Sequence, residues 1–252
     1  MPDSVTASPD LTAPPLSETQ RVVDTFVAPS KTFTDILRKA TFWGPLVIMI
    51  LVSVGFSYAV QQKVGWEKVF DNNLHQAPSR EEQFEKLSPE QQTTAKAAQA
   101  KGVAVTSYGA TVGVLLITLI TSLLVWLTVN LGFGGTSTYG KIFAVHMYGT
   151  LVLSVKYILA IITLFAGVAP DSFLFGNPVG SNVGYYLQGM EVPLWVVTMA
   201  SFVDAFAIWS LVLSTIGVAI VAKVSRGKAA AAVVGWYIVF VLVMTGLTAA
   251  FS

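Results

Sequence analysis

The chain has 252 residues, of which 54% are hydrophobic and only 12% are charged, and its formal net charge is +1. This charge content is about half of what a soluble domain carries, so the composition excludes an ordinary water-soluble domain. The small net charge argues against nucleic acid as a partner. Without cysteine, and with only two histidines, neither a disulfide scaffold nor a multi-ligand zinc site is expected.

The N-terminal region divides into two parts. Residues 1–21 are rich in Pro, Ser, Thr and Ala, which predicts a disordered tail. In residues 22–40 apolar side chains such as Phe26 and Phe33 recur at helical spacing, with Lys and Arg between them. This pattern predicts an amphipathic helix on the membrane surface just before the first span. The membrane domain is therefore expected to cover residues 22–252.

Long apolar runs with few or no charges predict five transmembrane helices. The expected spans are residues 44–62, 105–129, 142–165, 204–222 and 229–251. The stretch before Asp204, from Pro193 to about Ser201, is expected at the interface, because the two pieces together are too long for one span. The polar first loop, residues 63–104, contains capping signals at Ser79 and Ser88 and should form one or two short helices. The predicted fold class is thus an all-α polytopic membrane helix bundle.

The distribution of Lys and Arg predicts the orientation of the chain. Four lie just before the first span, Lys141 lies in the second loop and three lie in the fourth loop. The third loop, residues 167–191, has none. We therefore expect a cytoplasmic N-terminus and an extracytoplasmic C-terminus.

Three ionisable residues fall inside predicted helices: His146, Lys156 and Asp204. Such residues are costly in lipid and are candidate functional sites by default. From the helix rise, Lys156 lies about 22 Å and Asp204 about 28 Å above the cytoplasmic markers Lys141 and Lys223. This predicts that the two face each other. The alternative is that Asp204 caps its helix while Lys156 reaches the outer headgroups. His146 lies near the cytoplasmic edge and is expected to be solvated or hydrogen-bonded.

A second candidate feature is Gly109-x-x-x-Gly113 in the second span, a motif that allows another helix to approach closely. Packing within the monomer is favoured over dimerisation. The sequence offers no Ser/His/Asp arrangement, no paired intramembrane carboxylates and no metal-spaced cluster. No catalytic residue, cofactor site or metal site is therefore predicted, and the protein is not expected to be an enzyme.

Several stretches together resemble the Yip-domain family, named after proteins that interact with Ypt/Rab GTPases. They are Phe26-Val-Ala-Pro-Ser-Lys-Thr-Phe33, Trp43-Gly-Pro-Leu46, Phe143-Ala-Val-His-Met-Tyr-Gly149, Asp204-Ala-Phe-Ala-Ile-Trp209 and Ser225-Arg-Gly-Lys-Ala229. The long polar first loop resembles bacterial members, whereas the third span lacks a proline that many relatives have. The resemblance implies a five-span bundle with a cytoplasmic N-terminus. For eukaryotic relatives it also implies trafficking roles and GTPase contact, but no motif here supports a GTPase partner.

Two functions are compatible with these features. The first is a non-enzymatic scaffold or organising protein of the bacterial cytoplasmic (inner) membrane. Its partners would be the lipid bilayer and other membrane proteins or a second copy of itself. The alternative is a transporter, or a transporter subunit, with a charged site at Lys156 and Asp204. A water-accessible cavity that reaches these two residues would favour transport.

Overall fold

The computed structural model describes residues 14–188 and 190–251. Within these residues five helical segments are long and apolar enough to cross a membrane, which confirms the predicted polytopic helix bundle. The spans are α3 (Trp43–Lys63), α7 (Ala110–Leu127) with its π-helical extension η1 (Thr128–Gly132), α8 (Tyr139–Thr150) continued by α9 (Val152–Phe165), α12 (Ala205–Ala222) and α13 (Arg226–Phe251).

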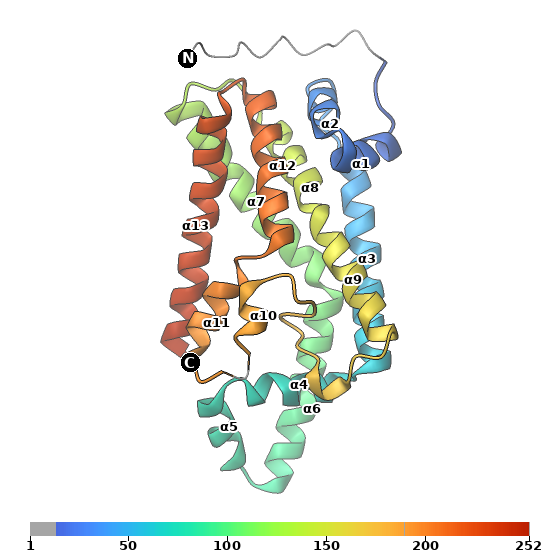
Figure 1. Ribbon diagram of the computed structural model, residues 1–252, viewed down its shortest axis with the longest axis vertical. Coiled ribbons are helices and arrows are strands. Elements are labelled where there is room, and N and C mark those ends of the chain that lie inside the picture. The colour runs from blue at the N-terminus through green and yellow to red at the C-terminus, as the bar shows by residue number, and fades with distance from the viewer. Residues whose placement is uncertain (1–13, 189, 252) are drawn as a thin grey trace.

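The remaining helices lie at the two ends of the bundle (Figure 1). One end carries α1 (Glu18–Val27) and α2 (Pro29–Ile36), together with the α7–α8 and α12–α13 connections. We call this the hairpin end. The opposite end, here the loop end, carries α4 (Trp66–His75), α5 (Pro78–Glu85), the start of α6 (Pro89–Tyr108), η2 (Pro170–Ser172), α10 (Val183–Tyr186) and α11 (Leu194–Ser201). The end of α13 also lies there.

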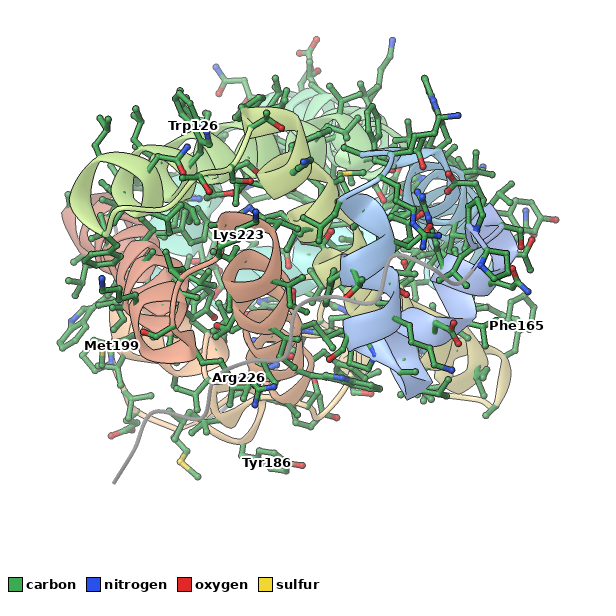
Figure 2. All side chains as sticks on the ribbon, turned by 90° about the horizontal axis from the view of Figure 1, so that it is seen from above. Trp126, Phe165, Tyr186, Met199, Lys223 and Arg226 are labelled. Carbon is green, nitrogen blue, oxygen red and sulfur yellow. The ribbon has the colours of Figure 1, made fainter. Side chains whose placement is uncertain are left out.

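A view along the bundle from the hairpin end shows how polar and apolar residues are distributed (Figure 2). Trp126, Phe165, Tyr186 and Met199 lie at the periphery, where a membrane or its interface would surround them. Lys223, by contrast, lies near the middle, in the tight turn that joins α12 to α13. Its left-handed backbone ends α12 there.

The segment before the first span differs from the prediction. It forms two helices, because Pro29 begins α2 and cannot continue the hydrogen bonding of α1. Phe33 and Ile36 are fully buried and belong to the same core cluster as residues of α8 and α12. The expectation that the apolar face of residues 22–40 lies on the lipid surface is therefore wrong for α2, whose apolar face packs against the bundle.

The predicted tail also ends earlier than expected. Ser17 and Gln20 form a reciprocal capping box, so that α1 begins at Glu18, before the predicted boundary at residue 22. Residues 1–13 of the predicted tail lie outside the described residues. In the polar first loop the capping box predicted at Ser88 is confirmed. The box predicted at Ser79 is wrong, because Pro78 already occupies the first turn of α5.

The predicted Gly109/Gly113 packing motif does not bring helices together within the monomer. Gly109 instead ends α6 and begins α7, and a Cβ built on Gly113 would meet no atom within 4 Å. Close approaches occur elsewhere, at Gly149 and Gly217, where α8 meets α12. The prediction that Gly109 and Gly113 pack helices together within the monomer is therefore wrong. Dimerisation through these two glycines stays a prediction.

Gly217 allows α2, the second helix of the α1–α2 hairpin, to approach α12 closely, and this predicts a measurable effect of substitution at Gly217. A Cβ at Gly217 would lie 2.9 Å from Cδ1 of Phe33 and would also collide with Val145. We expect Gly217→Ala to lower the free energy of unfolding in detergent by about 1–3 kcal/mol, because a packed core tolerates added volume poorly. The matched control is Gly235→Ala in α13, where the new Cβ meets nothing within 4 Å. Alanine's helix propensity should make this control neutral or stabilising. Equal effects would contradict the proposed contact.

Candidate functional site

The predicted pairing of Lys156 with Asp204 is confirmed. Lys156 lies on α9, and Asp204 immediately precedes α12. The Lys156 ammonium donates a hydrogen bond to Oδ2 of Asp204 at 2.9 Å. Only 14% of the Lys156 side chain and 5% of the Asp204 side chain are exposed. Pairing of this kind offsets part of the cost of burying each charge.

Asp204 also caps α12, so pairing with Lys156 and helix capping, which the sequence analysis gave as alternatives, both occur. Oδ1 accepts hydrogen bonds from the amides of Phe206 and Ala207, while Oδ2 binds Lys156 and accepts a 2.6 Å bond from the Ser181 hydroxyl. The amide of Ala205 donates to the carbonyl of Ser181. The carboxylate thus joins α9, α12 and the third loop. The part of the alternative that sends Lys156 to the outer headgroups is wrong.

His146 does not join this pair. It is buried on α8, and its Nδ1 lies 2.8 Å from the hydroxyl of Ser122 on α7. Of the two environments expected for His146, solvated or hydrogen-bonded, the structure shows the second. Lys156 is ten residues further along the third span, which corresponds to about 15 Å along a helix. The structure therefore brings together two of the three candidate residues and leaves the third in a separate interhelical contact.

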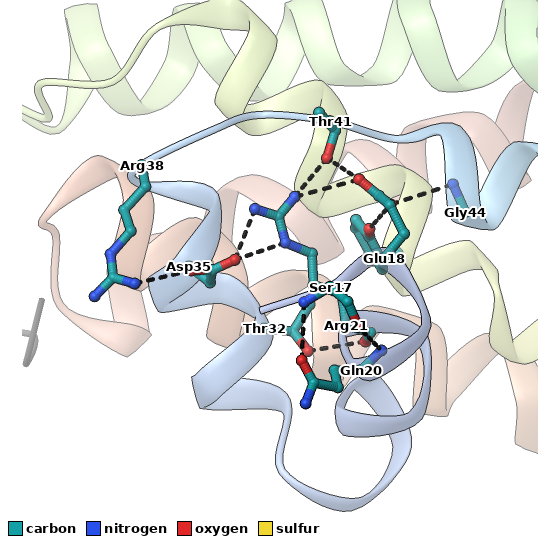
Figure 3. Close-up of polar contacts among 10 residues, drawn as sticks. Ser17, Glu18, Gln20, Arg21, Thr32, Asp35, Arg38, Thr41 and Gly44 are labelled. Atoms are coloured by element: carbon teal, nitrogen blue, oxygen red, sulfur yellow. Dashed lines mark hydrogen bonds and ion pairs between the residues drawn. The ribbon is translucent and has the colours of Figure 1, made fainter. Parts of the chain in front are cut away.

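A second polar cluster, which we call the hairpin clamp, holds α1 and α2 at the hairpin end (Figure 3). At its centre is the guanidinium of Arg21, whose side chain is 4% exposed. Nε and Nη2 each lie 2.7 Å from Oδ2 of Asp35, and Nη1 donates to the hydroxyl of Thr41. The carbonyl of Arg21 also accepts a hydrogen bond from Thr32. One residue of α1 therefore binds α2 and the linker to α3.

Glu18 extends the clamp to the membrane spans. Its carboxylate accepts hydrogen bonds from the hydroxyls of Thr41 and Tyr148 and from the amide of Gly44 in the first turn of α3. Partial burial raises the pKa of Glu18. These hydrogen bonds and the charge of Arg21 lower it by more than burial raises it, so that the net pKa lies below its ordinary value. The resulting stabilisation is present above that ordinary value and is lost as the pH falls through the folded-state pKa.

The comparison with family models identifies the domain. The model described as the Yip1 domain matches residues 23–247. The chain belongs to the Yip1-domain family. Neither the comparison with curated proteins nor that with solved structures gave a match.

The Yip1 domain match covers most of the contacts described above. It includes Asp35, Tyr148, Lys156 and Asp204, whereas Glu18 and Arg21 lie before it. The clamp therefore fastens a helix that begins outside the matched region to the spans inside it. The Yip1 domain is an integral membrane domain, as its five apolar helices show.

The polar contacts of this Yip1 domain hold its helices and loops to one another. A cleft of about 280 Å³ lies between α3, the α6–α7 junction and α9. Tyr157 lines it, but its lining includes neither Lys156 nor Asp204. Asp204 is bound by Ser181 and by amides at the start of α12, and neither Asp204 nor Lys156 lines this cleft.

Sequence analysis missed the hairpin clamp. Arg21 and Glu18 both fall within residues 1–21, whose composition predicts a disordered tail. One signal was present: Ser17 and Gln20 have capping-box spacing and place the start of a helix at Glu18. The contact between Arg21 and Asp35 has no comparable signal, because it depends on the turn between α1 and α2.

Proposed function

We propose that this Yip1-domain protein is a non-enzymatic scaffold or organising protein of the bacterial inner membrane, with its partner-binding surface at the hairpin end. The observation that carries the proposal is the hairpin clamp. A buried arginine and two carboxylates hold α1 and α2 in a fixed position on the spans. A surface held in this way is preorganised, which reduces the entropy lost when a partner binds.

The outer face of the hairpin has the character of a contact surface. Val23 and Val27, one turn apart on α1, are 53% and 73% exposed. Lys31 and Lys39 are exposed nearby, before and after the buried part of α2. Apolar side chains bordered by basic ones suit the headgroup region of an anionic bilayer or a partner protein lying on it. This supports the expected partners, which are lipid, other membrane proteins or a second copy of the chain.

Charge supports a cytoplasmic hairpin end. The described residues of that end hold eight Lys/Arg and three Asp/Glu, whereas the loop end holds six Lys/Arg and eight Asp/Glu. Excess basic residues favour the cytoplasmic side of a membrane. The N-terminus is therefore proposed to be cytoplasmic and the C-terminus extracytoplasmic.

This orientation predicts the behaviour of C-terminal fusions. Alkaline phosphatase attached after Ser252 should be active in intact cells, because the enzyme folds only outside the cytoplasm, and green fluorescent protein at the same place should be dark. The matched control places both reporters after Lys228, in the first turn of α13 at the hairpin end, where the opposite result is expected. Fluorescence from the Ser252 fusion would overturn the orientation.

Site-specific crosslinking tests the scaffold role. A photoreactive phenylalanine analogue at Val27 should give a discrete protein adduct in intact cells, identified by mass spectrometry. The adduct should disappear when Arg21→Ala breaks the clamp. The same analogue at Leu87, which is 37% exposed at the loop end, should be insensitive to Arg21→Ala. Adducts with lipid alone at Val27, or protein adducts that persist without the clamp, would contradict a preorganised surface for a partner protein.

Transport is the second candidate function, and the buried pair of Lys156 and Asp204 is the observation in its favour. The placement of the cleft apart from the pair supports the scaffold instead. Because the chain has no cysteine, a single Lys156→Cys variant reports directly on access. A scaffold predicts no labelling by a membrane-impermeant thiol reagent from either side. Labelling from one side that a substrate blocks would favour the transporter.

A further inference from the structure

The cleft between α3, the α6–α7 junction and α9 lies in the membrane-spanning part of the bundle. Its volume of about 280 Å³ is close to the lower limit of small-molecule sites. Ala110 and Tyr157, two of its lining residues, are exposed on the side of the bundle. The cleft therefore opens laterally, where the hydrocarbon of a bilayer would surround it. Ser53 lies ten residues into α3, about 15 Å from its start, and so near the middle of the bilayer.

Three hydroxyl-bearing residues of the lining are notable for having no partner. Within residues 14–188 and 190–251, the side chains of Ser53, Ser154 and Tyr157 take part in no hydrogen bond that the structure shows. Other hydroxyls of the cleft are bonded: Ser107 pairs with Ser57 at 2.7 Å, and Thr106 donates to the carbonyl of Gly102. A hydroxyl without a partner is costly in an apolar medium. These three donors therefore suit a ligand that brings acceptor oxygens.

Aromatic rings form one wall of the same cleft. Phe56 lies between Tyr157 and Phe175, with ring centroids 5.1 and 5.8 Å apart. Neighbouring rings of this kind provide a surface on which a planar group can pack with favourable geometry. The rest of the lining combines apolar side chains with serines and threonines, and it contains no charged side chain. A neutral ligand is therefore favoured over a lipid headgroup.

We propose that the cleft binds a neutral, planar lipophile that carries carbonyl oxygens, with the quinones as the chemical class. The ring packs against Phe56 and its aromatic neighbours, and Ser53, Ser154 or Tyr157 donates hydrogen bonds to the carbonyl oxygens. Such a molecule reaches the cleft from the bilayer through its lateral opening. The site lies apart from the hairpin clamp, so it does not depend on the scaffold role.

Two probes with the same carbon skeleton test this site. Duroquinone carries two carbonyl oxygens, and durene is the corresponding hydrocarbon. The full chain in phosphatidylcholine nanodiscs is dialysed to equilibrium against each probe, with empty nanodiscs as the control for partition into lipid. Because the chain has no thiol, covalent addition of the quinone to cysteine does not interfere. Saturable binding of duroquinone at one site per chain is expected, with at least severalfold weaker binding of durene.

Variants connect this binding to the hydroxyls. Ser53→Ala and Ser154→Ala should together weaken duroquinone binding about three- to tenfold, the effect of losing one hydrogen bond, and leave durene unchanged. Thr121→Val is the matched control, since this hydroxyl donates to the carbonyl of Ile117 and lies outside the cleft. Val114→Phe should fill the cleft and reduce binding of both probes. Helical circular dichroism spectra and melting curves identify any variant that fails to fold.

The outcomes separate cleanly. Loss of quinone preference in the serine variants, with the Thr121 control unaffected, supports the site. Equal affinity for duroquinone and durene would mean that the cleft does not recognise the carbonyl oxygens, and would overturn the proposal. Binding no greater than that of empty nanodiscs would also overturn it, as would serine variants with unchanged preference.

Discussion

Replacing Arg21 with alanine is expected to release the α1–α2 hairpin and to destabilise the bundle strongly. The guanidinium is buried and makes two 2.7 Å contacts with Asp35, which is itself buried. Removal of one partner from a buried ion pair leaves the other charge without compensation, which typically costs about 3–5 kcal/mol. Thr41 and Glu18 lose a partner at the same time. The expected result is a lower free energy of unfolding in detergent and rapid cleavage near Ala28 by added protease.

Arg38→Ala is the matched control for this experiment. Arg38 also contacts Asp35, but at 3.3 Å and with a side chain that is 22% exposed. We expect a loss of at most about 1 kcal/mol, because Arg38 is partly exposed and Asp35 keeps its two contacts with Arg21. Protease sensitivity should stay at the wild-type level in inverted vesicles. If the two variants behave alike, the clamp does not hold the hairpin.

The pH dependence gives a second readout of the same cluster. The pKa of Glu18 is held below its ordinary value by Thr41, Tyr148 and the amide of Gly44, against the effect of burial. Protonation removes the negative charge beside Arg21. Protease resistance of the hairpin should therefore hold at neutral pH and decline as the pH falls below the ordinary range of glutamate. Glu18→Gln should abolish that dependence, whereas an unchanged pH profile would show that another group controls docking.

The membrane-spanning part of the fold could be predicted because lipid imposes a strong and local constraint. A span must be apolar over about 20 residues, and its backbone must bond to itself. The division between α11 and α12 was also visible, since Asp204 is a good capping residue between two apolar stretches. Helix rise was sufficient to place Lys156 and Asp204 at similar heights, although it could not show that one carboxylate both pairs and caps.

Contacts that depend on a turn could not be predicted in this way. The side of the bundle on which α2 packs is decided by Gly217 and Phe33, which are far apart in the sequence and meet only in the folded chain. Gly109 and Gly113 matched a packing motif, yet Gly109 ends a helix and Gly113 faces open space. Spacing alone did not identify Gly149 and Gly217, the glycines at which α8 and α12 approach closely. It does not identify the helix that approaches, because this is set by the rotation of each span.

The second large effect is expected for the pair of Lys156 and Asp204. Lys156→Met leaves the Asp204 carboxylate buried with Ser181 and two backbone amides as its partners. We expect a loss of about 3–5 kcal/mol in the free energy of unfolding. Asp204→Asn leaves the ammonium without its partner, but an asparagine can still cap α12. The single substitutions should therefore both be harmful, with Lys156→Met at least as harmful as Asp204→Asn.

The double variant decides whether the two residues act as one unit. Lys156→Met with Asp204→Asn removes both charges, so its loss should be smaller than the sum of the single losses by at least about 1 kcal/mol. The same cycle on Lys86 and Glu82, whose side chains are 68% and 69% exposed, should show no measurable coupling. Reversible unfolding in detergent provides the free energies. Additive losses at Lys156 and Asp204 would mean that the 2.9 Å contact contributes no stability of its own, and the third loop would then have to be held by the cap and by Ser181.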